Sequence, residues 1–312
     1  MSIPKLIVIA GPTAVGKTAV SIELAKRLNG EIISADSMQV YKHMDIGTAK
    51  PTLEEMYGIK HYLIDEIEPS DAYSVAVFVQ KAKEYLNDIY QRGKQPIIAG
   101  GTGFYINALV YDNDFMSTNA EAENTAIREE LYKLADEQSE VGLHKLLMEI
   151  DPIAAERIHP NNVKRVIRAI EFHKLTGGKL ISEHNDTEKQ RTSPYDVSLF
   201  VLDMPREKLY GRIELRIDKM IQDGLVGEVQ HLLDMGVSPD AVSMRGLGYK
   251  EIVPYLQGHT TLDEAVELLK RNTRRFAKRQ LTWFRHQCDG ITINVDEASN
   301  EAIIDDIIRI LK

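Results

Sequence analysis

The sequence is poor in the residues that build disulfides, metal clusters and membrane spans. Its single cysteine, Cys288, excludes an internal disulfide and a cysteine-based zinc cluster, so we expect a reducing, cytoplasmic location. The first apolar run, Leu6–Ala10, is far too short to span a membrane and lacks the pattern of a signal peptide. The histidines show no metal-binding spacing such as H-E-x-x-H. We therefore expect a cytoplasmic protein that makes no contact with a membrane.

Positive charge is also scarce overall. The 312 residues include 38 lysines and arginines against 47 aspartates and glutamates, so the formal net charge is -9. That balance disfavours a polyanionic partner only weakly, because nucleic acid responds to a local basic patch rather than to the net charge. With 43% hydrophobic and 27% charged residues, the composition is typical of a globular protein with one large domain or two ordinary ones.

Short apolar runs alternate with helical patterns along the first third of the chain. Strands are expected at residues 6–10, 31–35, 61–64 and 95–99, and helices at residues 19–28 and 73–90. Unbroken apolar strands that alternate with helices are typical of a parallel sheet whose two faces are both covered. The pattern predicts an α/β fold with a doubly wound parallel sheet.

The composition changes near Ser117, where strand signals vanish. Amphipathic helices are expected at residues 126–135, 141–150 and 163–175, the last capped by Asn162. A strand returns at residues 197–202, followed by helices near residues 206–223, 226–235, 261–284 and 301–311. We predict a core formed by residues 1–116 and 197–312, interrupted by a helical insertion domain at residues 117–196.

A phosphate-binding loop lies between the first strand and the first helix. Gly11–Thr18 fits the pattern G-x-x-x-x-G-K-[ST], in which glycines let backbone amides surround a phosphate at the start of a helix. Lys17 supplies a positive charge and Thr18 a hydroxyl for Mg²⁺. The loop predicts phosphate binding but no particular reaction. The strand at residues 95–99 runs into Gly100–Thr102 without the acid that a switch ATPase usually carries there, which weakens a hydrolase assignment.

Asp36 follows the second strand, at the edge of a parallel sheet where ligands bind. A carboxylate near a bound phosphate group is electrostatically unfavourable, so its presence indicates a role. Two roles fit: coordination of Mg²⁺ through water, or acceptance of a proton from a nucleophile. A carboxylate that merely caps its own loop is the alternative.

The segment Asp36–Pro51 closely resembles the signature of the tRNA dimethylallyltransferases, also called tRNA isopentenyltransferases (the IPP transferase family). The resemblance continues in order along nearly the whole chain, at Gly100–Tyr105, Asp151-Pro152, Arg157–Asn161, Arg165, Arg168-Ala169, Arg212–Arg216, Arg245–Tyr249 and Lys278–Arg285. This ordered set is far more specific than the phosphate loop alone. It implies a P-loop NTPase-like fold with a helical insertion that grips the anticodon stem-loop of tRNA.

Members of this family transfer a dimethylallyl group from dimethylallyl diphosphate to N6 of adenine 37, next to the anticodon, and release diphosphate. The resemblance assigns Asp36, Thr102 and Arg216 to catalysis. The adenine amine is a poor nucleophile that must lose a proton as it attacks, and Asp36 is the expected acceptor. Ordinary turn and helix-surface roles are the alternatives for Thr102 and the arginines. The expected diphosphate-binding residues are Gly11, Thr13, Ala14, Val15, Gly16, Lys17, Thr18 and Arg212, with Thr18 as a ligand of Mg²⁺.

The RNA contacts are expected in three groups. Ser37, Met38 and Gln39 follow Asp36 directly and are placed to read the adenine, which must first be flipped out of the loop. In the insertion, Lys164, Arg165 and Arg168 lie on the most basic helix, with Arg128 as a weaker candidate. Near the C-terminus, a basic cluster with interleaved aromatic residues matches the family motif, although a solvated helix face is the usual explanation of such a run. The resemblance adds Arg245, Tyr249, Lys278, Arg279, Gln280, Trp283 and Arg285 to the expected tRNA contacts.

Three alternative functions remain open at this point. A prenyltransferase that acts on free AMP, ADP or ATP shares the active-site segments, but it needs neither a helical insertion nor basic clusters. A small-molecule P-loop kinase shares the loop and the sheet, but it does not explain Asp36–Pro51 or Lys278–Arg285. A noncatalytic RNA-binding protein does not require an intact Lys17 or Asp36. We expect tRNA and dimethylallyl diphosphate as substrates, Mg²⁺ as cofactor, and a monomer.

Overall fold

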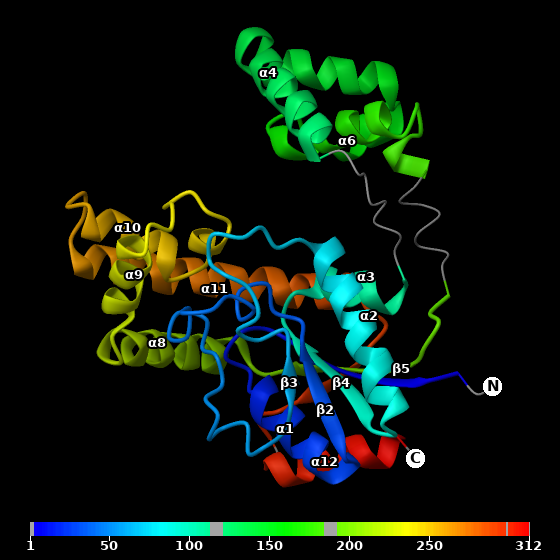
Figure 1. Cartoon of the computed structure of the whole chain (residues 1–312), viewed down its shortest axis with the longest axis vertical. Coiled ribbons are helices and arrows are strands. Elements are labelled where there is room, and N and C mark those ends of the chain that lie inside the picture. Colours follow the sequence, from blue (N-terminus) through cyan, green and yellow to red (C-terminus); the bar gives the residue numbers. More distant parts are fainter. Residues whose placement is uncertain (1–2, 113–120, 184–191, 298, 312) are drawn as a thin grey trace. The chain divides into compact units, whose positions relative to one another are not determined.

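The computed structural model describes residues 3–112, 121–183, 192–297 and 299–311 (Figure 1). The chain divides into two compact units. Residues 1–112 and 193–312 form one, which we call the core unit, and residues 113–192 form the other, which we call the helical unit. The boundary predicted between residues 116 and 117 lies outside the described residues. The boundary predicted after residue 196 falls at the start of a strand, four residues beyond the division between the units.

The core unit is built on a six-stranded sheet in the order β3-β2-β4-β1-β5-β6, and every pairing in it is parallel. The strands are β1 (Lys5–Ala10), β2 (Gly30–Ser34), β3 (His61–Tyr62), β4 (Gln95–Gly100), β5 (Asp196–Asp203) and β6 (Ile291–Asn294). β1 and β2 are buried along almost their whole length, as their unbroken apolar runs predicted. The predicted α/β class with a parallel sheet is therefore confirmed. β6 was not predicted, because this edge strand is short and largely exposed.

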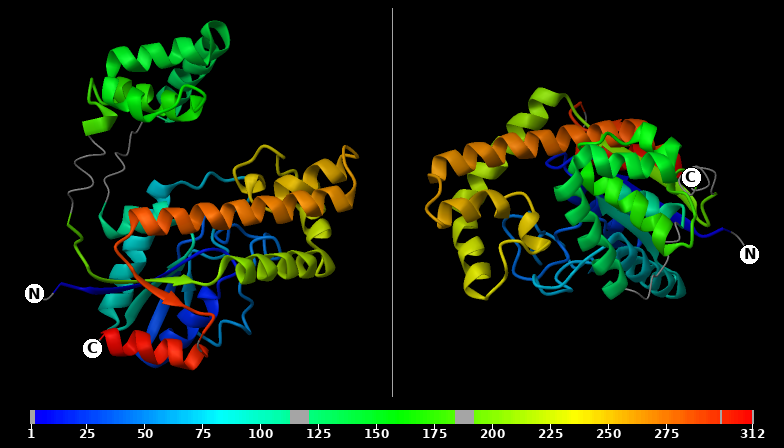
Figure 2. Two further views of the ribbon diagram at one scale, coloured as in Figure 1. Left: turned by 180° about the vertical axis from the view of Figure 1, so that it is seen from behind. Right: turned by 90° about the horizontal axis from the view of Figure 1, so that it is seen from above.

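Helices cover both faces of the sheet, as a doubly wound fold requires. α1 (Lys17–Leu28) packs against α12 (Asn300–Leu311), whereas α2 (Val75–Gln91) packs against α3 (Gly103–Val110). Figures 1 and 2 show these two pairs on opposite faces of the sheet. The phosphate loop follows β1, the segment that begins with Asp36 follows β2, and the glycine turn follows β4, so all three leave the sheet at its carboxyl edge. This edge of the sheet is where ligands of such folds bind.

A group of four helices lies beyond that edge. It consists of α8 (Arg206–Gln222), α9 (Leu225–Asp234), α10 (Tyr249–Leu256) and the long α11 (Leu262–Gln287). α11 packs on α8, α10 and α3, and Figure 2 shows it in orange as one continuous helix across the core unit. Thr261 and Glu264 form a capping box at its start. α10 was not predicted, because it is short and contains Pro254.

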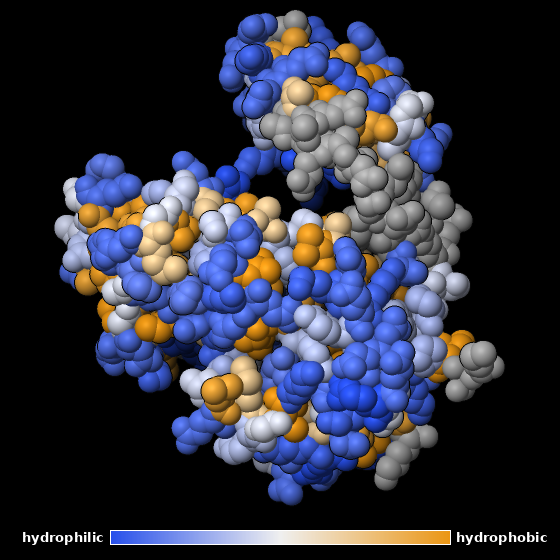
Figure 3. Space-filling view, viewed as in Figure 1, coloured by the Kyte–Doolittle hydropathy of each residue, from blue (hydrophilic) through white to orange (hydrophobic). Residues whose placement is uncertain are grey.

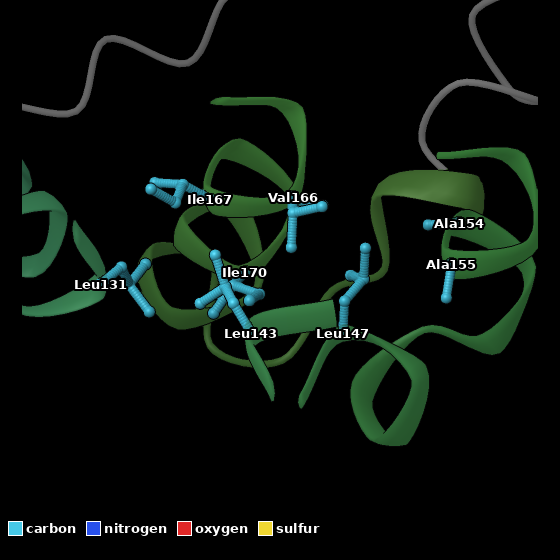
Figure 4. Close-up of a cluster of buried hydrophobic side chains, with 9 residues drawn as sticks. Leu131, Leu143, Leu147, Ala154, Ala155, Val166, Ile167 and Ile170 are labelled. Carbon is cyan, nitrogen blue, oxygen red and sulfur yellow. The ribbon is translucent and has the colours of Figure 1, made fainter. Parts of the chain in front are cut away.

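The helical unit contains α4 (Glu121–Ile150), α5 (Pro152–Arg157) and α6 (Val163–Leu175). α4 is interrupted at Ser139, whose backbone angles are φ 66 and ψ 166, so it consists of two helices, as the sequence predicted. The apolar side chains of all three elements form one core, shown in Figure 4. Asn162 is the N-cap residue of α6, as predicted, but its side chain makes no capping hydrogen bond.

No helix in the described part of the chain is both long and apolar enough to cross a membrane. Figure 3 shows hydrophilic residues over most of the visible face of the core unit, with hydrophobic residues scattered among them. The apolar residues are instead concentrated in the sheet and in the helix faces that cover it.

Candidate functional site

Two adjoining cavities lie at the carboxyl edge of the sheet in the core unit. The first, of about 270 Å³, is lined by the phosphate loop and the start of α1, and we call it the phosphate cavity. The second, of about 310 Å³, is lined by α8, α11 and the loop after β2, and we call it the helix-side cavity. Six residues line both of them: Thr13, Asp36, Thr48, Ala49, Arg216 and Phe276. The cavities therefore share a wall that contains one carboxylate and one guanidinium group.

The phosphate loop has the backbone that its glycines predicted. Gly11 has a φ of +146, and a Cβ atom there would lie 2.6 Å from the carbonyl oxygen of Leu202. Gly16 has a φ of +107 and caps the start of α1. Ala14 also has a positive φ, of 64. A loop with these left-handed conformations, placed at the positive end of α1, is typical of a phosphate-binding site.

Lys17 is folded back over its own loop. Its Nζ donates hydrogen bonds to the carbonyl oxygens of Gly11 at 3.1 Å and Pro12 at 2.8 Å. The pKa of Lys17 is lowered to about 8, mainly by burial; the nearby Asp36 opposes this shift, and Arg216 adds to it. A phosphate group in the cavity would replace the two carbonyls as acceptors and would favour the charged ammonium.

Asp36 is fixed by its own turn and still faces both cavities. Its Oδ1 accepts hydrogen bonds from the backbone amides of Met38 at 2.8 Å and Gln39 at 3.3 Å. In the described part of the chain, no hydrogen bond occupies its Oδ2. Asp36 thus caps its own loop through Oδ1. Its Oδ2 remains available for a proton or for a water on a metal ion.

The two arginines of α8 differ in position. Arg216 lines both cavities. Burial lowers its pKa, and the negative charge of Glu55 opposes this shift. Arg212 is exposed one turn earlier and lines neither cavity. Both were predicted to bind diphosphate, and the structure places only Arg216 at the site.

The residues predicted to face the adenine divide into two sets. Ser37, Met38 and Thr102 line the helix-side cavity together with Asp36. Gln39 lines the phosphate cavity instead, where its side chain bonds to Ser34 at 3.1 Å and to the carbonyl of Thr48 at 3.3 Å. The amide of Gln39 is therefore engaged within the protein, and the expectation that it reads a base is not supported by its position.

The basic cluster of α11 also divides into two faces. A surface hollow of about 630 Å³ is lined by residues that include Lys278, Arg279 and Trp283, as expected of an RNA-contacting face. Arg285 is exposed and pairs with Asp203 at 3.2 Å. Gln280, in contrast, is only 7% exposed, and it lines the phosphate cavity. Its predicted contact with RNA is corrected, because a side chain on the buried face of the helix cannot reach a macromolecule outside.

Tyr249 lines the helix-side cavity, where its contact with tRNA stays a prediction for a base that enters that cavity. Its side chain is fully buried and its hydroxyl donates to Glu228 at 2.6 Å. Glu228 also accepts hydrogen bonds from the amides of Asp45, Ile46 and Gly47 at 2.7 to 3.0 Å. This contact holds the loop that lines both cavities. Sequence patterns did not indicate this role of Glu228, because the three amides that it binds lie about 180 residues away along the chain. Arg245 lines the helix-side cavity, as a substrate contact there would require.

The predicted RNA contacts of the helical unit fall into two pairs. Arg128 and Arg168 bind the buried carboxylate of Glu171, at 2.6 Å and 2.9 Å. Lys164 and Arg165 are exposed, and neither forms an ion pair with another described residue. Lys164 and Arg165 are therefore the better candidates for phosphate contacts, while Arg128 and Arg168 have a structural role as well.

The phosphate cavity offers oxygen donors for Mg²⁺. In the described ranges, no group of three or more histidine, cysteine, aspartate or glutamate side chains could hold a metal ion. Mg²⁺ does not need such a cage, since it commonly binds through one or two protein oxygens, phosphate oxygens and water. The Thr18 hydroxyl is exposed in the phosphate cavity and Asp36 lies on its wall. These hard oxygen donors fit a magnesium ion that arrives with a diphosphate.

Comparison with known proteins gives a consistent set of matches. The profile of the IPP transferase family matches residues 39–287. The chain is 53% identical to the tRNA dimethylallyltransferase of Lachnoclostridium phytofermentans over 98% of its own length and 97% of that protein. A tRNA isopentenylpyrophosphate transferase from Staphylococcus epidermidis is 45% identical, with a TM-score of 0.73 over 99% of this chain and 98% of that one. A eukaryotic dimethylallyltransferase solved while acting on tRNA is 29% identical, with a TM-score of 0.82 over 98% of this chain and 80% of that one.

Proposed function

The chain belongs to the IPP transferase family, and we propose that it transfers a dimethylallyl group from dimethylallyl diphosphate to N6 of adenine 37 of tRNA. One observation carries the assignment of the site: Asp36 lies on the wall shared by a phosphate cavity and a second cavity. The first cavity suits the diphosphate of the donor. The second, with Ser37, Met38 and Thr102, suits the flipped adenine.

The chemistry follows from that placement. The N6 atom of adenine attacks C1 of the dimethylallyl group, a C–N bond forms, and the C–O bond to diphosphate breaks. Asp36 accepts the N6 proton, a contribution that is typically worth about 10²–10⁴-fold. The negative charge that develops on diphosphate is stabilised by Lys17, by Arg216 and by the amides of the phosphate loop. Mg²⁺, held by the Thr18 hydroxyl and the diphosphate, would neutralise part of the same charge.

The proposed RNA contacts use exposed positive charge in both units. In the core unit, Lys278 and Arg279 lie on the exposed face of α11 beside Trp283. In the helical unit, Lys164 and Arg165 are exposed on α6. Such residues bind phosphates and fix the position of an RNA, while contacts to the flipped base give specificity. We propose that the protein acts as a monomer in the cytoplasm.

A prenyltransferase for free nucleotides is the competing function. It would need the two cavities but neither the helical unit nor the basic face of α11. The presence of both features favours tRNA as the acceptor. The small-molecule kinase and the noncatalytic RNA-binding protein are disfavoured by membership of a family of transferases.

The experiment that tests the function is transfer of label from radioactive dimethylallyl diphosphate. Unmodified tRNA, AMP and a reaction with ATP in place of the donor are compared in the presence of Mg²⁺. We expect label in tRNA and none in AMP. Label in AMP alone would instead support the free-nucleotide enzyme, and no incorporation into tRNA would refute the proposal.

A further inference from the structure

Gln280 joins three segments that are far apart in the sequence. It lies on the buried face of α11, whereas Lys278 and Trp283 of the same helix line the surface hollow. Its Oε1 accepts a hydrogen bond from the backbone amide of Thr13 at 2.9 Å, and its Nε2 donates to the carbonyl of Gly101 at 2.9 Å. The phosphate loop after β1 and the glycine turn after β4 are thereby tied to one side chain of α11.

The contact leaves little freedom in either partner. A Cβ atom at Gly101 would lie 2.4 Å from Nε2 of Gln280, so the close approach of the turn depends on glycine. Both polar atoms of the amide have a partner. The bond to Gly101 is buried and the bond from Thr13 is partly buried, so the loss of either would leave polar groups unsatisfied. The amide of Thr13, because it donates to Gln280, is not one of the amides that can face a phosphate.

The two segments that Gln280 ties together both border the phosphate cavity, and both reach the helix-side cavity. Thr13 lines both cavities, whereas Gly101 lines the phosphate cavity and its neighbour Thr102 lines the helix-side cavity. Asp36 lies on the wall between them. The separation of the loop and the turn therefore sets the separation between a bound diphosphate and a base in the second cavity.

We propose that Gln280 is a positioning residue for the transfer reaction, which holds the phosphate loop and the β4 turn at the spacing that brings donor and acceptor together. The proposal rests on the function proposed above and replaces the RNA contact predicted for this residue. Reacting groups held in line gain a large rate advantage, and a misplacement of about 1 Å costs on the order of 100-fold.

The first test replaces Gln280 with methionine, which is similar in size but makes neither hydrogen bond. Gln280→Met is expected to lower kcat by on the order of 100-fold while the KM for tRNA changes little. Gln222→Met is the matched control, because Gln222 is exposed at the end of α8 and lines neither cavity. A kcat for Gln280→Met within about twofold of the wild type would overturn the proposal.

The second test uses Gln280→Glu and does not depend on the stability of the methionine variant. An ionised glutamate can accept from Thr13 but cannot donate to Gly101, whereas a protonated one can do both. The ratio of kcat for this variant to kcat for the wild type should therefore rise as the pH is lowered from about 8 to 6. Lys17, Asp36, Arg216 and His61 line the same cavity in both proteins. Any pH dependence that these groups give to kcat is therefore shared and cancels in the ratio. A ratio that does not change with pH would overturn the proposal.

A binding measurement separates this proposal from the function on which it rests. If the wild type transferred no prenyl group, the proposed function would fail, yet its affinity for magnesium pyrophosphate could still be measured. Loss of the two bonds in Gln280→Met should then weaken pyrophosphate binding by about tenfold. An unchanged dissociation constant would contradict the role of Gln280 in positioning the loop.

Discussion

Charged side chains have different surroundings at the two ends of the parallel sheet in the core unit. At the amino ends of β2 and β4, Glu31 is buried and accepts hydrogen bonds from Arg92 at 2.6 and 2.7 Å, Lys94 at 2.7 Å and Tyr62 at 2.8 Å. The Arg92 guanidinium is the main reason that the pKa of Glu31 falls to about 2. The charges of this network are paired with one another, so the network contributes to stability and offers little to a ligand.

At the carboxyl ends of the strands, the charged groups face cavities instead. Lys17 bonds only to backbone carbonyls, and in the described part of the chain neither Asp36 nor Arg216 forms an ion pair. Charges that are held in place but not neutralised can respond to a ligand. The comparison teaches that the same sheet supports stability at one end and chemistry at the other. Substitutions at the two ends should therefore have separable effects.

The largest effect on activity is expected at Asp36. Asp36→Asn keeps an oxygen for the amides of Met38 and Gln39 but removes the proton acceptor, so kcat should fall by about 10²–10⁴-fold. Thermal unfolding and tRNA binding should stay close to those of the wild type. Full transfer activity in this variant would remove Asp36 from its role as general base.

The second largest loss of activity is expected when Arg216 is replaced. Arg216→Gln removes a positive charge that faces the developing diphosphate, and kcat should fall by roughly 10²–10³-fold. Arg212→Gln is the matched control on the same helix, and its effect should be far smaller because Arg212 lines neither cavity. Equal losses in the two variants would contradict the placement of Arg216 alone at the site.

At the opposite end of the sheet, Glu31→Gln should reduce stability and spare activity. Removing one partner from this buried network should lower the free energy of unfolding by about 2 kcal/mol, measured by urea denaturation. Glu23→Gln, which breaks an exposed pair with Arg27, should change it by less than about 0.5 kcal/mol.

The effect of Glu31 on stability has a defined dependence on pH. Its pKa is lower in the folded protein than in the unfolded chain, so the stabilisation is complete above the unfolded value of about 4.3. It is lost as the pH falls towards 2, where the folded carboxylate takes up its proton. The difference between wild type and Glu31→Gln should shrink over that range, and a constant difference would contradict the ion-pair account.

Deprotonation of Lys17 should have a smaller effect on activity, and this effect should appear only at alkaline pH. Because its pKa is about 8, the ammonium loses its proton above that pH, and kcat/KM for dimethylallyl diphosphate should decline there. Lys17→Arg keeps the charge and should move the decline to higher pH. A flat profile to pH of about 9.5 would show that Lys17 does not titrate in the free enzyme.

The smallest effect is expected on the exposed face of α11. Lys278→Gln should weaken tRNA binding a few-fold and reduce the slope of binding against salt by about 1. Lys219→Gln on α8, where Lys219 pairs with Asp223 at 3.1 Å, is the control and should leave the slope unchanged. An unaltered slope for Lys278→Gln would exclude a phosphate contact there.

Local sequence patterns predicted most of the fold because they depend on neighbours in the chain. The apolar run of β1, the glycines of the phosphate loop and the helical period of α6 each report a local conformation. The weakest predictions concerned elements with little local signal, such as the exposed edge strand β6 and the short α10 that contains Pro254.

The functional roles that sequence reasoning missed depend on contacts between distant segments. Gln280 and Tyr249 were grouped with RNA contacts because they stand in motifs with arginines and lysines. Their side chains form hydrogen bonds within the core unit, to Thr13 and Glu228 respectively, while each also lines a cavity. A motif records which residues occur together in the chain, but the contacts between distant segments decide what each residue holds in place.

The most direct test of the account uses synthetic anticodon stem-loops. One carries adenine 37 next to the anticodon, and its partner carries guanine at that position but is otherwise identical. Each is incubated with dimethylallyl diphosphate and Mg²⁺, digested to nucleosides and analysed by mass spectrometry. The account predicts N6-isopentenyladenosine from the adenine stem-loop only. Prenylation of the guanine stem-loop, or no prenylated nucleoside from either, would contradict it.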